Sequence, residues 1–324
     1  MMTKIKKIAV FSSGGDSPGM NSAIRAVVRT ALAHNLDVMG INRGYQGMIE
    51  DDFVEMESKS VRNIIQRGGT ILRTARSEEF KTPAGRKKAY GNLKKHGINA
   101  VVVIGGDGSF KGAGIFSQEY DIPFIGMPGT IDNDMFGTDY TIGFDTALNT
   151  VTEAIDKIKD TAFSHDRTFF VEVMGRDAGF IALKAGIATG AEMVLIPEVE
   201  GQEEKLEELL KSSEKSSNII IVAEGNNIGG AHEVAKKFGT KYKSHGIRVN
   251  ILGHMQRGGS PSAFDRYLAS RLGVAAVDAL IDNQRSVMVG YSNHEVVLVP
   301  FNKTIKGKRD VGDELLRVNE ILAK

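Results

Sequence analysis

Short runs of apolar residues alternate with amphipathic stretches along almost the whole chain, and this alternation limits the fold more than any other feature. Residues 8–11 (IAVF) and 100–104 (AVVVI) have no polar face, which is typical of strands covered on both sides. Further runs of this kind are residues 169–173, 193–197 and 219–223. The stretch that follows residues 8–11 has apolar side chains at helical spacing, at Ile24, Val27, Val28, Ala31 and Leu32. Strands alternating with helices predict an α/β fold with mainly parallel sheets, and 324 residues at roughly 150 per domain suggest about two domains.

The composition argues against several classes of function. Lys and Arg number 41 and Asp and Glu 40, so the net charge of +1 gives no global field that would attract nucleic acid or an anionic membrane. The chain has no Cys, which excludes disulfides, thiolate metal sites and a cysteine nucleophile. It has no Trp and only 7% aromatic residues, so stacking on bases is not expected. We therefore expect no nucleic-acid partner.

No segment predicts a secretory signal or a membrane span. Residues 1–7 are basic, but the apolar run behind them, residues 8–11, is shorter than the about 7–15 residues of a signal. No apolar stretch approaches the ~18 residues of a membrane-spanning helix. We expect a cytoplasmic protein with no membrane partner.

Seven of the 37 glycines stand in segments that directly follow predicted strands. The segments are residues 12–16 (SSGGD), 105–109 (GGDGS), 174–176 (MGR) and 224–225 (EG). Each glycine could simply provide the positive φ of a tight turn. Parallel sheets, however, bind their ligands at the carboxyl ends of the strands. The recurrence of such segments, most of them with a charged residue inside or beside the glycines, favours a shared ligand cleft.

The GGDGS segment has the composition of a phosphate-binding loop. Glycines allow backbone N–H groups to approach phosphate oxygens, and the amino end of a following helix adds positive potential. Asp107 in such a loop could hold Mg²⁺. Neither G-x-x-x-x-G-K-[ST] nor G-x-G-x-x-G occurs, which argues against a P-loop ATPase and a standard dinucleotide oxidoreductase. A purely structural turn remains the alternative.

Residues 128–134 (PGTIDND) follow the apolar run 124–127 and carry two carboxylates two positions apart. They could form an Asx-rich turn whose side chains bond to their own backbone. Alternatively, one carboxylate could act as a general base. The spacing alone leaves both interpretations open.

Basic side chains gather in two further places. Residues 254–259 (HMQRGG) follow the apolar run 248–252 and combine imidazole, amide and guanidinium donors suited to a phosphate dianion. Arg25 and Arg29 lie four apart on one helical face, where they could bind an anion or simply be solvated. The grouping of donors in residues 254–259 favours the interpretation that this segment binds an anion.

Taken together, these motifs resemble the bacterial ATP-dependent 6-phosphofructokinase family. The matching segments stand in the family's order, at residues 13–21, 105–109, 128–134, 173–176 and 252–261, and the resemblance runs from about Lys6 to the last helix. It implies two Rossmann-like three-layer α/β/α domains. It also implies transfer of the γ-phosphoryl group of ATP to the 1-hydroxyl of fructose 6-phosphate, with Mg²⁺ as cofactor.

The resemblance further implies roles for individual residues. Asp132 would be the general base, and the other catalytic residues would be Thr130, Arg176 and Arg76. Nucleotide binding is implied for Gly15, Arg76, Ser77, Gly106, Asp107, Gly108 and Ser109, with Asp107 as the metal carboxylate. Sugar-phosphate binding is implied for Thr130, Ile131, Asp132, Arg167, Met174, Gly175, Arg176, Glu224, Arg248, His254, Met255, Gln256 and Arg257. In the family, the arginines that match Arg167 and Arg248 enter the sugar site from a neighbouring subunit, so a homotetramer is implied.

The resemblance also bears on the donor and on regulation. Gly108 and Gly129 stand where pyrophosphate-dependent relatives often carry Asp and Lys, which favours ATP. The effector pattern is matched only in part: Arg25, Arg29 and Glu192 stand where the family has them, Lys159 replaces an arginine, and a lysine-rich stretch is reduced to Lys215. Ser58-Lys59 replaces an Arg-Tyr pair and Asn63 replaces an aspartate, so we expect a weakened response to ADP and phosphoenolpyruvate. A sigmoidal fructose 6-phosphate curve that ADP straightens would contradict this expectation.

The implied domains are residues 1–142 plus 255–305 for ATP and residues 143–254 plus 306–324 for the sugar phosphate. Two alternatives remain at this point. One is a pyrophosphate-dependent or different-sugar kinase of the same fold, and the other is a catalytically inactive sugar-phosphate sensor. Asp107, Asp132, Arg76 and Arg176 are all present, which argues against the inactive sensor.

Overall fold

The computed structural model describes residues 5–212, 217–242 and 245–323. The chain divides into two compact units, each assembled from separate segments. The first contains Met1–Ile131, Met135–Thr146 and Arg257–Arg309, and the second contains Asp132–Asp134, Ala147–Gln256 and Asp310–Lys324. Both are α/β structures whose sheets are mainly parallel, as predicted.

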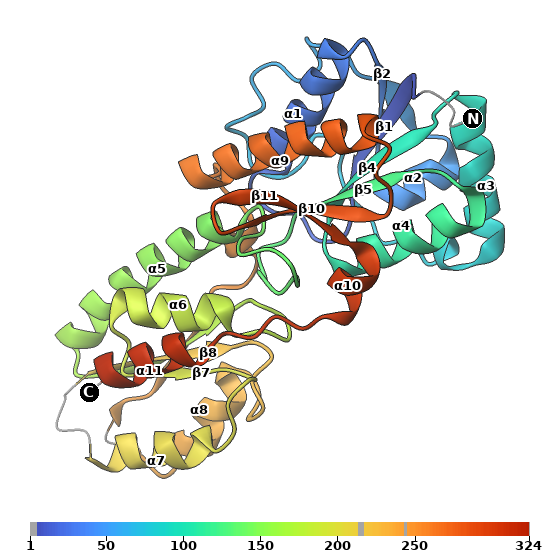
Figure 1. The fold of residues 1–324 in the computed structure, drawn as a ribbon. Helices are drawn as coiled ribbons and strands as arrows, with labels where there is room; N and C mark the ends of the chain where they lie inside the picture. Colours follow the sequence, from blue (N-terminus) through green and yellow to red (C-terminus); the bar gives the residue numbers. More distant parts are fainter. Residues whose placement is uncertain (1–4, 213–216, 243–244, 324) are drawn as a thin grey trace. The chain divides into compact units, whose positions relative to one another are not determined.

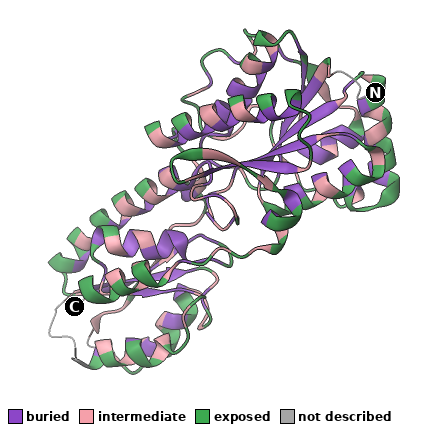
Figure 2. Ribbon diagram, in the orientation of Figure 1, coloured by how far each residue is buried: buried purple, intermediate pink, exposed green. Residues whose placement is uncertain are grey.

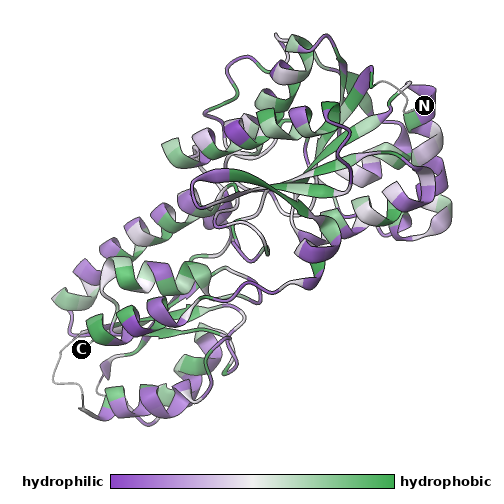
Figure 3. Cartoon of the chain, in the orientation of Figure 1, coloured by the Kyte–Doolittle hydropathy of each residue, from purple (hydrophilic) through white to green (hydrophobic). Residues whose placement is uncertain are grey.

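Unit 1 is built on a sheet that has seven strands within the described residues, in the order β11-β10-β5-β4-β1-β2-β3. The strands are β1 (Lys7–Ser12), β2 (Asp37–Ile41), β3 (Phe53–Glu55), β4 (Ala100–Gly105), β5 (Phe124–Pro128), β10 (Val287–Ser292) and β11 (Glu295–Pro300). The inner pairs are parallel, whereas β3 and β11 run antiparallel at the two edges. Figure 2 shows the central strands buried along their length, and Figure 3 shows that they are hydrophobic.

Helices cover both faces of this sheet (Figure 1). They are α1 (Met20–Ala33), α2 (Gly44–Glu50), η1 (Glu79–Lys81), α3 (Pro83–Lys95), α4 (Asp107–Tyr120), α9 (Ala263–Ile281) and α10 (Phe301–Lys306). Because successive strand residues point to opposite faces, Val10 packs with α1 and α9, while Phe11 packs with α2, α3 and α4. Both faces must therefore be apolar, which explains the uniformly apolar residues 8–11 of β1 and 100–104 of β4.

Unit 2 contains a parallel sheet whose described strands number four, in the order β7-β8-β6-β9. They are β6 (Thr168–Val173), β7 (Met193–Leu195), β8 (Asn218–Ala223) and β9 (Arg248–Ile251). The helices are α5 (Phe144–Ser164), which begins in unit 1, α6 (Phe180–Thr189), α7 (Gln202–Ser212), α8 (Ala231–Gly239) and α11 (Asp313–Leu322), with a short η3 (Gly253–Arg257). Leu206 and Leu210 of α7 and Val234 of α8 pack on one face of the sheet with Phe170 and Val222.

Several boundaries differ from the predictions. The run 193–197 forms a strand only as far as Leu195: Ile196 donates its N–H to Gln202 Oε1 at 2.9 Å, and Pro197 has no N–H to donate. The run 248–252 ends at Ile251 and is a partly exposed edge strand. The antiparallel hairpin of β10 and β11 was not predicted at all. No helix in the described part of the chain is long and apolar enough to cross a membrane.

Candidate active site

In unit 1, three predicted segments lie side by side because they follow three neighbouring strands. β1 pairs with β4 and β4 pairs with β5, all in parallel, so their carboxyl ends meet at one edge of the sheet. Ser13 donates its backbone N–H to the carbonyl of Ile104 at 2.9 Å, and Gly129 donates to that of Gly105 at 3.0 Å. The glycine loops after β1 and β4 and the segment that leads to Asp132 are thus held together.

The glycines of residues 105–109 are not explained by a tight turn. Gly105, Gly106 and Gly108 do not have positive φ, in contrast to Gly14 and Gly175. Gly105 has a packing reason, because an added Cβ would lie 2.6 Å from the Ser13 carbonyl oxygen. At Gly108 an added Cβ would meet nothing within 4 Å. The space beside Gly108 is therefore left open at the first turn of α4, as a phosphate-binding helix end requires.

Asp107 is the first residue of α4 and is exposed. Within the described ranges, no three His, Cys, Asp or Glu side chains are grouped so as to hold a metal ion. Mg²⁺ is usually held by one or two carboxylates together with substrate phosphates and water. A single exposed carboxylate next to the open position at Gly108 could hold Mg²⁺ only together with ligands from outside the protein, and does not resemble a preformed metal cage.

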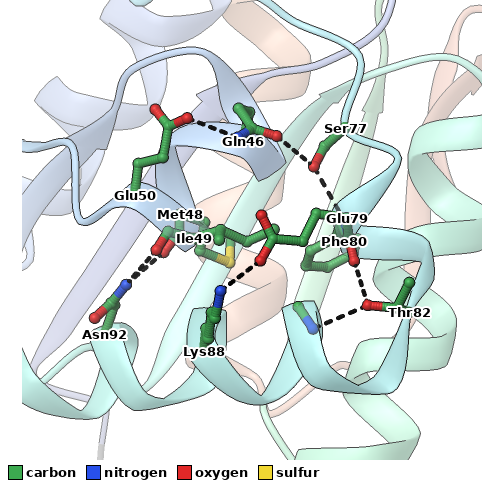
Figure 4. A network of polar contacts seen from close by, with 11 residues as sticks. Gln46, Met48, Ile49, Glu50, Ser77, Glu79, Phe80, Thr82, Lys88 and Asn92 are labelled. Carbon is green, nitrogen blue, oxygen red and sulfur yellow. Dashed lines mark hydrogen bonds and ion pairs between the residues drawn. The ribbon is translucent and has the colours of Figure 1, made fainter.

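Arg76 and Ser77 lie on the segment that leads into η1. Arg76 is exposed, whereas the Ser77 hydroxyl is engaged: it donates to Gln46 Oε1 at 2.7 Å and accepts the N–H of Phe80 at 3.2 Å (Figure 4). Gln46 in turn donates to Glu50 at 2.6 Å. Ser77 therefore fixes the segment that carries Arg76, and its own hydroxyl has no spare proton for a nucleotide.

The segment after β5 is fastened at several points. Thr141 donates its hydroxyl to the carbonyl of Thr130 at 2.6 Å, and Ile142 donates its N–H to that of Pro128 at 2.8 Å. Ile131 is 2% exposed, so its side chain packs in the protein and only its backbone can meet a ligand. Asp132, in contrast, is partly exposed.

Gly129 has a structural reason that the sequence did not show. A Cβ at this position would lie 2.8 Å from Ile104 Cγ2 and 3.2 Å from Met20 Cε. Packing alone therefore explains glycine at position 129. Gly129 is weaker support than Gly108 for the prediction that ATP is the phosphoryl donor.

In unit 2, the predicted residues at the carboxyl ends of β6 and β8 are joined by hydrogen bonds. Arg176 donates its backbone N–H to Glu224 Oε1 at 2.7 Å, and Met174 donates to Gln256 Oε1 at 3.1 Å. Gln256 is fully buried and donates to the Gly253 carbonyl at 3.0 Å. Gly225 lies so close to Arg176 that a Cβ there would be 2.1 Å from the Arg176 carbonyl oxygen. The loops after β6, β8 and β9 are thus joined by hydrogen bonds and close packing.

The Arg176 backbone is in the left-handed region, with φ at 56°. This conformation is uncommon for arginine and usually occurs where the surroundings impose it. The side chain is exposed, with its Nε 3.6 Å from Asp177 Oδ2. The hydrogen bond from the Arg176 N–H to Glu224 thus helps to hold Arg176 in a conformation that leaves its guanidinium exposed beyond the carboxyl end of β6.

The basic cluster of residues 254–259 is divided between the units. His254 and Met255 are exposed in η3 of unit 2, whereas Arg257 belongs to unit 1. The Arg257 guanidinium lies against Gly15, where an added Cβ would be 1.9 Å from Nη1. Its buried Nε has no hydrogen-bond partner among the residues that the structure describes. Sequence spacing did not reveal that Arg257 adjoins the first glycine loop.

Arg167 and Arg248 lie at the amino ends of the strands in the unit 2 sheet. Arg167 precedes β6, and Arg248 begins β9 beside Phe169. Met174 and Arg176 follow the other end of β6. Because β6 and β9 are parallel, the length of a strand separates the two arginines from Met174 and Arg176. The structure does not bring these two groups together within one chain.

The predicted effector residues occupy both units. Arg25 and Arg29 lie on α1, where burial and the neighbouring Arg29 lower the pKa of Arg25. Lys159 and Glu192 line a cavity of about 420 Å³ together with Phe163, which is 76% exposed. Lys159 donates to the Thr189 carbonyl, and Glu192 accepts the N–H of Ile219 at 2.8 Å. Lys215 lies outside the described residues.

Comparisons with known proteins agree with the motifs. The phosphofructokinase family model matches residues 7–280. The chain is 56% identical over 320 residues to ATP-dependent 6-phosphofructokinase 2 of Bacteroides thetaiotaomicron, and the match covers 98% of each chain. It is 53% identical over 322 residues to ATP-dependent 6-phosphofructokinase 1 of Thermus thermophilus, covering 98% of this chain and 100% of that one.

Solved structures agree as well. The structure of phosphofructokinase from Saccharomyces cerevisiae matches with a TM-score of 0.88 and 39% identity over 98% of this chain, which spans 48% of the yeast chain. A pyrophosphate-dependent phosphofructokinase from Marinobacter aquaeolei matches with a TM-score of 0.85, over 98% of this chain and 92% of that one. Its 20% identity shows a shared fold alone.

Proposed function

The chain belongs to the phosphofructokinase family, and we propose that it transfers the γ-phosphoryl group of ATP to the 1-hydroxyl of fructose 6-phosphate, giving fructose 1,6-bisphosphate and ADP. The observation that carries this proposal is the identity of 56% over nearly the full length to a relative named as an ATP-dependent 6-phosphofructokinase. This reaction is a step of glycolysis, and we place the enzyme in the cytoplasm.

We assign the nucleotide to unit 1. The first turn of α4 and the open space beside Gly108 would receive its phosphates, with Gly15 and Arg76 alongside. Asp107 would hold Mg²⁺ together with phosphate oxygens and water, and the ion would neutralise charge on the transferred group. Phosphoryl transfer needs in-line positioning and charge neutralisation. The hydrogen bonds that join the loops after β1, β4 and β5 would help to position the nucleotide.

We assign the sugar phosphate to the loops of unit 2 and to residues 130–132. Asp132 would accept the proton of the sugar's 1-hydroxyl as the hydroxyl oxygen attacks the γ-phosphorus of ATP. Arg176 would stabilise the negative charge on the transferred group, and Glu224 would fix Arg176 and contact the sugar. His254 and Arg257 would bind the 6-phosphate. The domain roles predicted above, residues 1–142 plus 255–305 for ATP and the remainder for the sugar, remain part of this proposal.

A donor assay tests the proposed function. Fructose 6-phosphate is offered with ATP, GTP or pyrophosphate, with and without Mg²⁺, and fructose 1,6-bisphosphate is measured by a coupled assay. We expect turnover with ATP that requires Mg²⁺. Turnover with pyrophosphate but not ATP would instead establish the pyrophosphate-dependent alternative, and binding of both substrates without ADP release would establish the inactive sensor.

Gly108→Asp is expected to raise the KM for ATP by about 10-fold or more, because the new carboxylate would enter the phosphate space and repel the γ-phosphate. The matched control is Gly108→Ala, which adds only a methyl group where nothing lies within 4 Å. Because position 108 lies in a helix, alanine should keep or raise the free energy of unfolding. Equal ATP kinetics in both variants and the parent protein would show that the space beside Gly108 does not hold the nucleotide.

We further propose that Arg167 and Arg248 serve the sugar site of a neighbouring subunit in a homotetramer. Their place at the edge of the sheet away from Arg176 supports this. Arg248→Ser is expected to raise the KM for fructose 6-phosphate about 10- to 100-fold, as the loss of a charge-assisted hydrogen bond would.

Mixing subunits tests the sharing directly. Asp132→Ser and Arg248→Ser proteins are each weak alone at low fructose 6-phosphate. When the two proteins are co-refolded at equal amounts, about half of the subunit pairs contain one of each variant. Each mixed pair has one site with both Asp132 and Arg248 intact, so about one quarter of the normal sites should be recovered. No recovery in mixed oligomers would place Arg248 in its own subunit's site.

For the effector residues we retain the weakened response to ADP and phosphoenolpyruvate. The bonds of Lys159 and Glu192 to protein backbone groups support it, because neither side chain is presented to a ligand alone.

A further inference from the structure

A fully buried carboxylate, Asp265, lies in the first turn of α9. Its Oδ1 accepts the N–H of Gly143 at 2.8 Å. Its Oδ2 accepts the N–H of Thr146 at 2.8 Å and the Thr146 hydroxyl at 2.5 Å. Burying a carboxylate is costly unless it is well bonded, and these donors are all neutral. Such a group is not needed to fill space, because an apolar side chain would do so at lower cost.

The bonds of Asp265 fix the start of α5. The first N–H groups of a helix have no partners within the helix, and a negative charge there is favourable. Asp265 satisfies two of them from a position 119 residues from Thr146. Ser262 completes the junction: its N–H donates to the Thr146 hydroxyl at 2.9 Å and its own hydroxyl to Asp145 at 2.6 Å.

The start of α5 is in turn fastened to the segment that precedes Asp132. Thr141 and Ile142, the residues before Gly143, hold the carbonyls of Thr130 and Pro128. The junction cannot move freely, because an added Cβ at Gly143 would lie 2.5 Å from Ser17 Cβ, and one at Gly19 would lie 2.7 Å from Ile142 Cγ2. A short, tightly packed path thus joins Asp265 to Thr130, two residues before Asp132.

We propose that Asp265 is a positioning residue for the reaction: its carboxylate fixes Gly143 and Thr146, and through residues 141–142 it sets the placement of the Asp132 segment. This inference rests on the function proposed above. Misplacing a catalytic group by about 1 Å can cost on the order of 10²-fold in rate. Loss of the carboxylate should therefore act on kcat and leave substrate affinity largely intact.

The test compares Asp265→Asn with the parent protein. The asparagine keeps one acceptor but turns an amide donor toward the N–H of Gly143 or of Thr146. We expect kcat to fall about 10- to 100-fold, with KM values for both substrates changed less than about threefold. Amide hydrogen exchange at Gly143 and Thr146 should become faster. An unchanged kcat together with faster exchange would show that Asp265 supports α5 without positioning the catalytic segment.

A second pair of variants covers the case in which Asp265→Asn does not fold. Thr146→Val removes the hydroxyl that donates a hydrogen bond to Asp265, and Thr146→Ser keeps this hydroxyl. We expect kcat of Thr146→Val to be about 2- to 10-fold below that of Thr146→Ser. Equal kcat values would overturn the proposal. Absence of any fructose 6-phosphate turnover in the parent protein would refute the proposed function instead, while the exchange measurement would still report whether Asp265 holds the two amides.

Discussion

Asp132→Ser is expected to lower kcat by about 10²–10⁴-fold while the KM for fructose 6-phosphate changes little. A well-placed general base contributes about that factor, because it removes the hydroxyl proton as the new bond to phosphorus forms. The serine removes the carboxylate from a partly exposed position whose neighbours are fastened by Thr141 and Ile142. The loop should therefore keep its conformation. Steady-state kinetics with saturating ATP separate kcat from KM.

Asp134→Ser is the matched control, because Asp134 lies two residues further in the same segment and is also partly exposed. Its kcat should remain within about threefold of the parent protein, since general-base catalysis belongs to one carboxylate. If Asp134→Ser instead loses the rate and Asp132→Ser does not, the base is the second carboxylate. Parent-like kcat in both variants would remove this segment from proton transfer.

Arg176→Ser is expected to lower kcat by about 10²–10³-fold, the usual effect of removing a donor aimed at transition-state charge. Arg176→Lys is the matched control, because it keeps the positive charge and a Cβ at the residue whose φ is 56°. Lysine lacks the planar fork that binds two oxygens at once, so we expect an intermediate kcat.

Stability measurements complete this comparison. The Arg176 side chain is exposed, so both variants should keep the free energy of unfolding within about 0.5 kcal/mol of the parent protein. A parent-like kcat in Arg176→Ser would exclude Arg176 from charge stabilisation. A large loss of stability would show that the residue supports the loops after β6 and β8.

Local sequence predicted the elements that have a strong local signal. Helix α1 was predicted because its apolar side chains recur at helical spacing along the buried face. Strand β4 was predicted because it is buried on both faces and therefore apolar throughout. The α/β class followed from the same alternation. The hairpin of β10 and β11 was missed although residues 296–299 (VVLV) form a continuous apolar run; what the sequence does not show is that β11 is an edge strand of half-buried and exposed residues.

The site was predictable where a motif follows a strand and less so where distant residues decide. The loops after β1, β4, β6 and β8 lie at strand ends as expected. The roles of Ser77, Gly129 and Arg257 depend on Gln46, Ile104 and Gly15, which are far from them in sequence. Asp265 stands in an S-x-x-D pattern with Ser262 that is typical of a helix start, but its bonds to residues 143 and 146 have no local signal, because those partners are recognised only in three dimensions.

The interleaved segments of unit 1 have a consequence for synthesis on the ribosome. The chain makes β5 early, but the strand that pairs with its free edge, β10, and the helix that covers α1, α9, follow only after the whole of residues 147–256. At roughly 5–20 residues per second, β5 waits about 8–30 s for β10, and the apolar face of α1 waits about 12–50 s for α9. During this interval the nascent chain presents an unpaired strand edge and an uncovered helix face, which are the surfaces that molecular chaperones bind.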